Sequence, residues 1–378
     1  MKVNIFGTLD TAIKFLLNNP DLKVNAFIDG IIAKESKIDF PTTSYKVIPF
    51  NHAEKELRQC YTVVATSDTT YFKVKKRLED VYGLKEFENF ESCSTFRKKV
   101  VLMYGNCHLS SIKTQIETSI EFSKVYGIYP FQAICGLSDK IPFTTWFPNT
   151  VLKRCDILLY QYITDDVKDL YKTSVTSKEL LSKINSNCIC YCLPNFAKQA
   201  RFMFPQFGGF SEKYINGVKL FKRIDLFVEE FKNQLSAKEI AQNIKTESFF
   251  DKSKIKEEFD AFITKMEIRD HQWDITVAKF LKSNYREHQL FFDETHPTPF
   301  LLKFISSRIF EFLDISDSIV TDGYILDATE LPIQNSAIKA LNLKFTPREY
   351  IKQYDKCFSL SKLSINYEEY VRQYLLQP

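Results

Sequence analysis

The sequence predicts an α/β protein with two successive parallel-sheet domains and a mainly helical C-terminal part. Short apolar runs alternate with helical patterns from the first residues onward, which is typical of a parallel sheet covered by helices. The alternation pauses at a polar join, residues 88–96, and then begins again. Glycine (10 of 378 residues) and proline (13) are scarce, which argues against disorder and against a loop-rich all-β chain.

The first domain is expected over residues 1–95 and is predicted to be a small nucleotide-fold (Rossmann-like) domain. Asp29 lies 22 residues after Gly7, a spacing similar to that of a dinucleotide-binding fingerprint. The fingerprint needs further glycines, whereas this turn reads Gly7-Thr8-Leu9-Asp10-Thr11. A degenerate structural domain, or one that senses a sugar nucleotide, is therefore favoured over a dinucleotide site. Its expected elements are strands at 3–6, 24–29 and 61–66 and helices around 12–17 and 72–81.

The second domain is expected over residues 98–315, followed by a helical extension over 316–378. The segment near 230–285 is mainly helical and highly charged, and it could cover a pocket or form the contact of a homo-oligomer. Ser236 and Glu239 have the spacing of a capping box at a helix start. The expected strands are 99–104, 125–129, 156–160 and 188–193, with helices at 177–184 and 307–313.

Composition and charge exclude several classes of function. The net charge is only +4, and the basic clusters are short, so we do not expect nucleic-acid binding. No window reaches the roughly 20 apolar residues of a membrane span, and no signal peptide is visible. The nine cysteines are expected to be reduced thiols in the cytoplasm. Cys188, Cys190 and Cys192 lack a paired Cys-x-x-Cys or a nearby histidine, so no metal site is predicted.

Polar residues that follow the predicted strands are the candidates for a site. In parallel sheets, ligands gather beyond the carboxyl ends of the strands. Asn106, Cys107 and His108 follow the first strand of the second domain, and Gln161 and Asn195 follow two others. Cys107 also precedes a predicted helix, whose N-terminus would lower the pKa of a thiol. A small buried residue that fills a tight turn is an equally good interpretation of Cys107.

A second candidate is the segment Asp293-Glu294-Thr295-His296-Pro297. An aspartate and a histidine three residues apart can share one turn, so that the carboxylate orients the imidazole as a general base. Alternatively, His296 only ends a loop before proline. His108 is a further candidate base, although neighbours on a turn usually point apart.

These motifs resemble those of the WcbI family of polysaccharide-biosynthesis enzymes. The likeness covers residues 98–315 and rests on residues that occur in the same order: Gly105, Asn106, Cys107, Gln161, Asp293, His296 and Pro297. The plan is also similar to that of SGNH hydrolases and acyltransferases, with Cys107 where their serine stands and Asn195 in the place of an oxyanion-hole asparagine. The family usually has glutamine after the cysteine, and this chain has His108.

The resemblance implies an acetyltransferase that uses coenzyme A (acetyl-CoA) and acts on a glycan or nucleotide-sugar hydroxyl in capsule or lipopolysaccharide biosynthesis. Cys107, His296 and Asp293 would be catalytic, and Asn106, His108, Gln161, Asn195 and Arg201 would contact the ligand. Two alternatives stay open. The same groups would serve an esterase that deacylates glycans, and the eroded glycine motif makes a non-catalytic binding protein plausible.

Overall fold

The computed structural model describes residues 2–40, 43–134, 147–164, 176–196, 201–204, 207–215, 218–243, 250–319, 329–331, 333–346, 350–354 and 362–376. The chain divides into two compact units. Unit 1 holds residues 1–113, 117–192 and 315–317, and unit 2 holds 114–116, 193–314 and 318–378. These units do not coincide with the segments 1–95, 98–315 and 316–378, whose status as domains stays a prediction.

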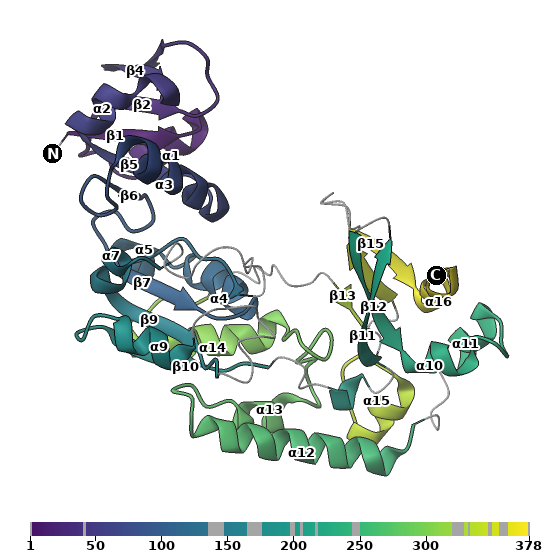
Figure 1. The fold of residues 1–378 in the computed structure, drawn as a ribbon. Coiled ribbons are helices and arrows are strands. Elements are labelled where there is room, and N and C mark those ends of the chain that lie inside the picture. Colours follow the sequence, from purple (N-terminus) through teal and green to yellow (C-terminus); the bar gives the residue numbers. More distant parts are fainter. Residues whose placement is uncertain are drawn as a thin grey trace. The chain divides into compact units, whose positions relative to one another are not determined.

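Unit 1 begins with a six-stranded sheet of order β3-β4-β2-β1-β5-β6 (Figure 1). Its neighbouring strands pair in parallel except β3 with β4, which are antiparallel. The strands are β1 (Lys2–Gly7), β2 (Lys23–Asp29), β3 (Ser36–Phe40), β4 (Thr43–Pro49), β5 (Tyr61–Ala65) and β6 (Phe90–Ser92). The helices are α1 (Leu9–Leu17), α2 (Glu54–Gln59) and α3 (Asp68–Tyr82), with a 3-10 turn at Phe50–His52.

Helices cover both faces of this sheet because successive side chains of a strand point to opposite faces. On β1, Val3 and Ile5 pack in a core with Ala12 and Leu16 of α1. Phe6 faces the other way, into a core with residues of α2 and α3. The predicted α/β fold is therefore confirmed here. Helix α3 ends at Gly83, whose φ of 65° glycine adopts without strain.

A second sheet in unit 1 has the order β10-β9-β7-β8. Its central strand β7 pairs in parallel with β8 and with β9. The strands are β7 (Lys99–Tyr104), β8 (Tyr126–Ile128), β9 (Cys155–Gln161) and β10 (Ile189–Leu193), and the helices are α4 (His108–Ile116), α5 (Ile120–Val125), α7 (Asn149–Arg154) and α9 (Ser177–Lys183). The last residues of α4 and of β10 belong to unit 2.

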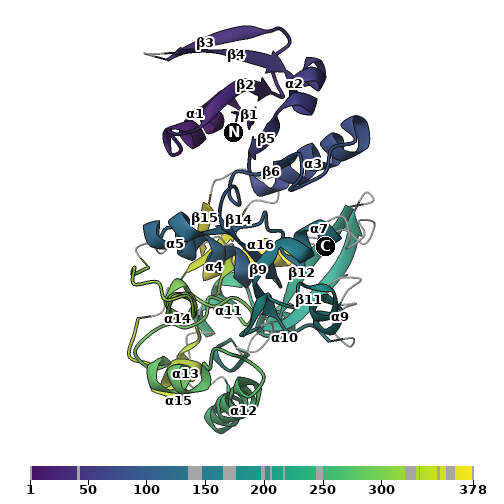
Figure 2. The ribbon, with the colours of Figure 1, turned by 90° about the vertical axis from the view of Figure 1, so that its left-hand side faces the viewer.

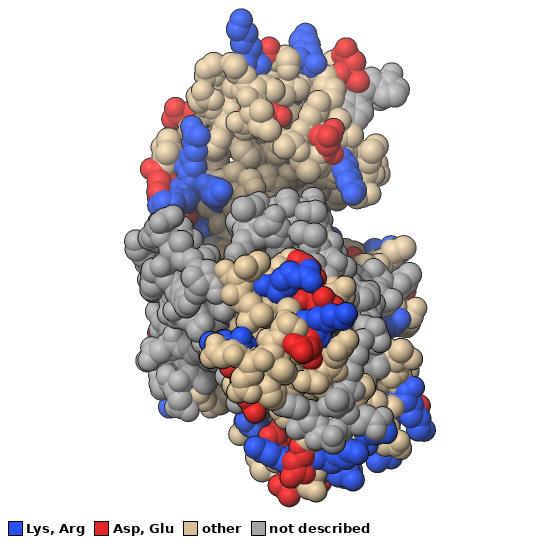
Figure 3. Space-filling view, turned by 90° about the vertical axis from the view of Figure 1, so that its right-hand side faces the viewer, with Lys and Arg blue, Asp and Glu red and all other residues tan. Residues whose placement is uncertain are grey.

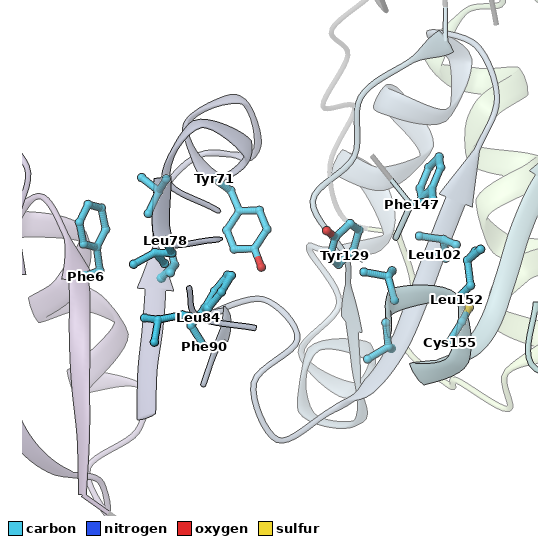
Figure 4. Packing of buried hydrophobic residues seen from close by; sticks show 14 of the residues in the cluster. Phe6, Tyr71, Leu78, Leu84, Phe90, Leu102, Tyr129, Phe147, Leu152 and Cys155 are labelled. Carbon is cyan, nitrogen blue, oxygen red and sulfur yellow. The ribbon is translucent and has the colours of Figure 1, made fainter. Parts of the chain in front are cut away.

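One buried cluster continues from the first sheet into the second (Figure 4). The rings of Tyr71 on α3 and Tyr129 after β8 lie 6.0 Å apart, edge to face. Both hydroxyls donate hydrogen bonds to the carboxylate of Glu86, which is almost completely buried. Burial raises the pKa of Glu86, and Lys75 opposes that rise from 3.0 Å.

Unit 2 combines helices with two small antiparallel sheets, which Figure 2 shows from the side. The helices of unit 2 agree with the sequence-based prediction, whereas these strands were not predicted. The strands are β11 (Phe207–Ile215) with β12 (Val218–Asp225), and β13 (Thr329–Glu330), β14 (Tyr350–Tyr354) and β15 (Lys362–Asn366). The helices are α10 (Leu226–Phe231), α11 (Ala237–Asn243), α12 (Lys252–Asp270), α13 (Ala278–Asn284), α14 (Pro299–Phe312), α15 (Asn335–Leu341) and α16 (Tyr367–Leu376), with a 3-10 turn at Arg201–Met203.

One local prediction in unit 2 is confirmed, and a second helix is extended. Glu239 accepts hydrogen bonds from the backbone and hydroxyl of Ser236, which is the predicted capping box before α11. The helix predicted over 307–313 is longer than expected: α14 begins at Pro299, because proline is well suited to the first position of a helix. The described surface carries basic and acidic side chains in mixture on the face drawn in Figure 3.

Candidate active site

The loop after β7 lies at the carboxyl edge of the second sheet. The parallel pairing of Tyr104 with Tyr160 brings the ends of β7 and β9 side by side. As a result, the side chain of Gln161, the last residue of β9, accepts a hydrogen bond from the backbone N–H of Asn106 at 2.8 Å. The loop and Gln161 therefore meet, as the rule for strand ends led us to expect.

Gln161 is fully buried and is itself fixed by its neighbours. Its backbone oxygen accepts a 3.0 Å hydrogen bond from the hydroxyl of Ser177, and that hydroxyl accepts from the N–H of Ile163 at 2.7 Å. The side-chain amide of Gln161 thus holds the loop after β7 in place through its hydrogen bond with Asn106. Ser177 was not identified from the sequence, because its role depends on contacts across 16 residues.

Close packing around position 105 explains why this loop starts with a glycine. A Cβ at this position would lie 2.6 Å from Oε1 of Gln161 and 2.7 Å from a methyl of Leu109, closer than such atoms approach. The backbone oxygen of Gly105 also accepts from the N–H of Ile134 at 2.9 Å. Gly105 thus allows the close approach that lets Gln161 reach Asn106.

Asn106 lies just before helix α4 and caps its start. Its Oδ1 accepts from the N–H of His108 at 2.9 Å, satisfying one of the N–H groups that a helix start leaves open. Asn106 and His108 are almost fully buried, whereas Cys107 between them is half-buried and is not part of a disulfide. Of the three predicted residues in this loop, Cys107 is therefore the one that offers its side chain to a ligand.

The second motif forms the predicted carboxylate–imidazole pair in unit 2. Oδ2 of the fully buried Asp293 lies 2.9 Å from Nδ1 of His296. Oδ1 accepts the backbone N–H groups of Thr295 and His296, both at 2.7 Å. Because an ionised carboxylate only accepts hydrogen bonds, Nδ1 of a neutral His296 carries the hydrogen and Nε2 keeps its lone pair. The side chain of His296 is a quarter exposed.

The chain around His296 is pinned on both sides. Phe291 and Pro297 form an isolated antiparallel bridge, and the N–H of Phe292 donates to the oxygen of His296 at 2.8 Å. The hydroxyl of Thr298 donates to the oxygen of Gln289 at 2.8 Å, just before α14 begins. His296 therefore sits in a rigid turn, as base chemistry requires.

Asn195 lies in unit 2 close to this turn. Its neighbour Phe196 contacts the ring of Phe291 at 5.7 Å and that of Trp273 at 6.4 Å. The oxygen of Asn195 accepts from Arg269 of α12 at 3.2 Å, and the same guanidinium lies over Trp273 at 5.9 Å. Arg269 thus places a cation against the ring of Trp273. Arg201 begins the 3-10 turn Arg201–Met203, and its side chain lies outside the described residues.

The comparisons with known proteins concern both the loop that carries Cys107 and the Asp293–His296 pair. A family model described as "Polysaccharide biosynthesis enzyme WcbI" matches residues 100–318, more than half of the chain. The chain belongs to the WcbI family of polysaccharide biosynthesis enzymes. The matched range includes Cys107, Gln161 and the Asp293–His296 pair, so the resemblance on which the sequence analysis relied is confirmed.

A solved structure of WcbI, described as a novel polysaccharide biosynthesis enzyme, is similar in fold. The TM-score is 0.56 at 15% identity, and the likeness covers 75% of this chain and 91% of the other. That structure is described as native protein without a disulfide bond between coenzyme A and a cysteine of that protein. No curated protein is significantly similar to this chain.

The candidate residues thus fall into two groups, each defined within its own unit. In unit 1 the structure brings together Asn106, Cys107, His108 and Gln161, and in unit 2 it pairs Asp293 with His296. The joint action of Cys107 and His296 stays a prediction. Within the part of the chain that the structure describes, no helix is long and apolar enough to cross a membrane.

Proposed function

We propose that the protein transfers an acyl group, most simply acetyl, from coenzyme A to a sugar hydroxyl during polysaccharide biosynthesis. The observation that carries this proposal is the bond between Asp293 and Nδ1 of His296. It leaves Nε2 ready to accept a proton, which is the requirement for activating a hydroxyl group.

Membership of the WcbI family supports the glycan part of the proposal, since the family is named for polysaccharide biosynthesis. The coenzyme A part is supported by the similar structure, whose description mentions coenzyme A together with a cysteine. In this chain Cys107 is a half-buried cysteine that lies just beyond the carboxyl end of β7, where ligands of parallel sheets gather.

The residues present fit such a ligand. Cys107 precedes helix α4, whose first N–H groups favour a partial negative charge such as that of a thioester oxygen. Arg269 offers a cation beside the flat face of Trp273, a combination that suits a phosphate next to an aromatic base. When bound, the coenzyme A thioester supplies an activated carbonyl carbon.

His296 takes the proton of the sugar hydroxyl through Nε2, and Asp293 stabilises the imidazolium that results. The hydroxyl oxygen forms the new ester bond as the carbon–sulfur bond breaks, and His296 returns its proton to the departing thiolate. Cys107 lines the thioester site. Asn106 and Gln161 act as positioning residues for the loop that carries Cys107.

Release of free thiol from acetyl-CoA tests this proposal. We expect release only when a sugar acceptor is added, so a panel of monosaccharides and nucleotide-sugars should be screened. Cleavage of acetylated sugars without any effect of coenzyme A would instead identify an esterase. If coenzyme A does not raise the melting temperature, and neither thiol release nor ester cleavage is found with any acceptor, the protein is a binding or scaffold protein.

A further inference from the structure

A cavity of about 1000 Å³ lies in unit 1, away from Cys107. One wall is Ala65–Ser67, at the carboxyl end of β5, and another is the face of α1 that carries Lys14 and Phe15. Segments 93–98 and 117–124 complete the walls. Its volume is that of a site for a small organic ligand.

The sheet topology favours a ligand at this place. From β1 the chain crosses to β2 on one side, while β5 pairs with β1 on the other side. The strand order therefore reverses between β1 and β5, whose last residues, Gly7 and Ala65, are paired. Ligands of open α/β sheets bind at such a reversal, outside the carboxyl ends of the strands.

The ligand cannot sit as a dinucleotide usually does. A Cβ on Gly7 would lie 2.4 Å from the oxygen of Ala65, and the hydroxyl of Thr11 donates to the same oxygen at 2.8 Å. Gly7 is thus needed for close packing of β1, α1 and β5. Asp29, in the place of a ribose-binding carboxylate, accepts the N–H groups of Ile31 and Ile32 and so holds its own turn.

The charge of the cavity walls is positive. Lys14, Lys98 and Lys124 line the cavity together with one carboxylate, Glu117. Glu117 is paired with Lys113 at 2.8 Å. Among the described residues, no carboxylate forms an ion pair with any of the three lining lysines. An anion would therefore find excess positive charge here.

One buried hydroxyl and one half-buried lysine also favour a ligand in this cavity. The hydroxyl of Thr66 is shielded from water and has no hydrogen-bond partner among the described residues, which is costly unless a ligand supplies one. Burial lowers the pKa of Lys98, so a nearby anion would stabilise its ammonium group. Both residues line the same cavity.

We propose that this cavity is a second ligand site, which binds a phosphorylated sugar, either a sugar phosphate or a nucleotide-sugar. The lysines hold the phosphate, and Thr66 and Asn18 bind sugar hydroxyls. The rings of Phe15 and Phe96, 6.1 Å apart, offer apolar surface to the ring of a sugar or base. The site is independent of the acyl-transfer proposal, because none of its residues has a role there.

Equilibrium binding to the full chain tests the site with four probes at millimolar concentration: glucose, inorganic phosphate, glucose 1-phosphate and UDP-glucose. We expect glucose 1-phosphate or UDP-glucose to bind at least about tenfold more tightly than glucose or phosphate alone. Binding of both phosphorylated probes indicates a site for the sugar phosphate, whereas binding of UDP-glucose alone indicates that the nucleotide is also read. If neither binds, the proposal is wrong.

Variants show whether the cavity is the site. Lys14→Ala should weaken binding of the phosphorylated probe by about tenfold, and Lys98→Met should do the same. Lys37→Ala is the matched control, since Lys37 is an exposed lysine on β3 that does not line the cavity. Lys14 is exposed on α1, so its loss is not expected to impair folding even if Lys98→Met does. Equal binding by Lys14→Ala and the control would overturn the proposal.

Coenzyme A separates this inference from the proposed function. Saturating coenzyme A should leave binding of the phosphorylated probe unchanged, and Cys107→Ala should leave it unchanged too. Competition by coenzyme A would show that the cavity belongs to the coenzyme A site, which also overturns the inference. Failure of acyl transfer, by contrast, leaves the expected binding in place.

Discussion

The carboxylate of Asp293 joins the side chain and the backbone of His296 at once. Its Oδ2 lies 2.9 Å from Nδ1 of the imidazole, and its Oδ1 accepts the backbone N–H of the same residue at 2.7 Å. The second contact fixes which oxygen faces the ring. A change at Asp293 can therefore alter the tautomer of His296 without altering the turn.

Asp293→Asn should lower kcat by about 10²–10⁴-fold with little change in KM. The two backbone N–H groups keep the amide oxygen on their side, so the amide NH₂ faces Nδ1 of His296 and donates to it. The hydrogen of the imidazole then moves to Nε2, which can no longer accept a proton. Steady-state kinetics of thiol release from acetyl-CoA measure the effect.

Asp293→Ala is the companion variant. It removes the buried acceptor of two N–H groups as well, so it should also lower the melting temperature, whereas Asp293→Asn should not. Full activity of Asp293→Asn would exclude His296 as the base.

Gly105→Ala should lower the free energy of unfolding by about 1–3 kcal/mol, because the new Cβ displaces Gln161 and leaves the N–H of Asn106 without that acceptor. Urea unfolding measures the change. Gly30→Ala is the control, since a Cβ there meets nothing closer than Phe6 at 3.7 Å. Equal stability of the two variants would contradict the packing role of Gly105.

The sequence predicted those parts of the structure that depend on short-range patterns. The buried runs of β1, β5, β7 and β9 are apolar, so they were identified as strands. Asp293 and His296 are three positions apart, so the geometry of the pair depends on a single turn. The antiparallel strands β11, β12, β14 and β15 were missed because their sequences mix charged and apolar residues, and only pairing between strands stabilises them.

The support of the site could not be predicted for a related reason. Gln161 reaches Asn106 only because Tyr104 pairs with Tyr160, and one step of slippage would turn its side chain to the other face of the sheet. The rule for strand ends placed Gln161 at the correct edge. It did not show that the amide would bind the loop, nor that Ser177 would hold Gln161 in turn.

The stability of unit 2 should depend on pH through Asp225. Burial raises the pKa of this carboxyl from 3.8 to about 6, although Tyr367 and two N–H groups of α10 donate to it. Between about pH 4 and pH 6 the folded state keeps a proton that the unfolded chain has lost. The free energy of unfolding therefore falls as pH rises through this window, by about 3 kcal/mol in total.

Asp225→Asn removes that dependence and keeps the acceptor of the two N–H groups. We expect the variant to match the wild type near pH 4 and to be the more stable protein above about pH 6. Urea unfolding at several pH values provides the comparison. A wild type that gains stability relative to Asp225→Asn as pH rises would show that the sign is wrong.

Two neighbouring lysines on α3 should differ sharply in their contribution to the free energy of unfolding. Lys75 is 4% exposed and lies 3.0 Å from the buried Glu86, whereas Lys76 is 70% exposed and pairs with Asp80. Lys75→Met should lower the free energy of unfolding by about 3–5 kcal/mol, because it leaves Glu86 buried without its cation. Lys76→Met is the matched control and should change it by about 0–0.5 kcal/mol.

The cause can be separated from lost packing by lowering the pH. Burial already raises the pKa of Glu86, and loss of Lys75 removes the group that opposes that rise. Glu86 of the variant would then take up a proton more readily, and a neutral carboxyl is less costly to bury. The difference in free energy of unfolding between the wild type and Lys75→Met should therefore become smaller as pH falls. A difference that is the same at all pH values would indicate that Lys75 stabilises α3 through the packing of its alkyl chain.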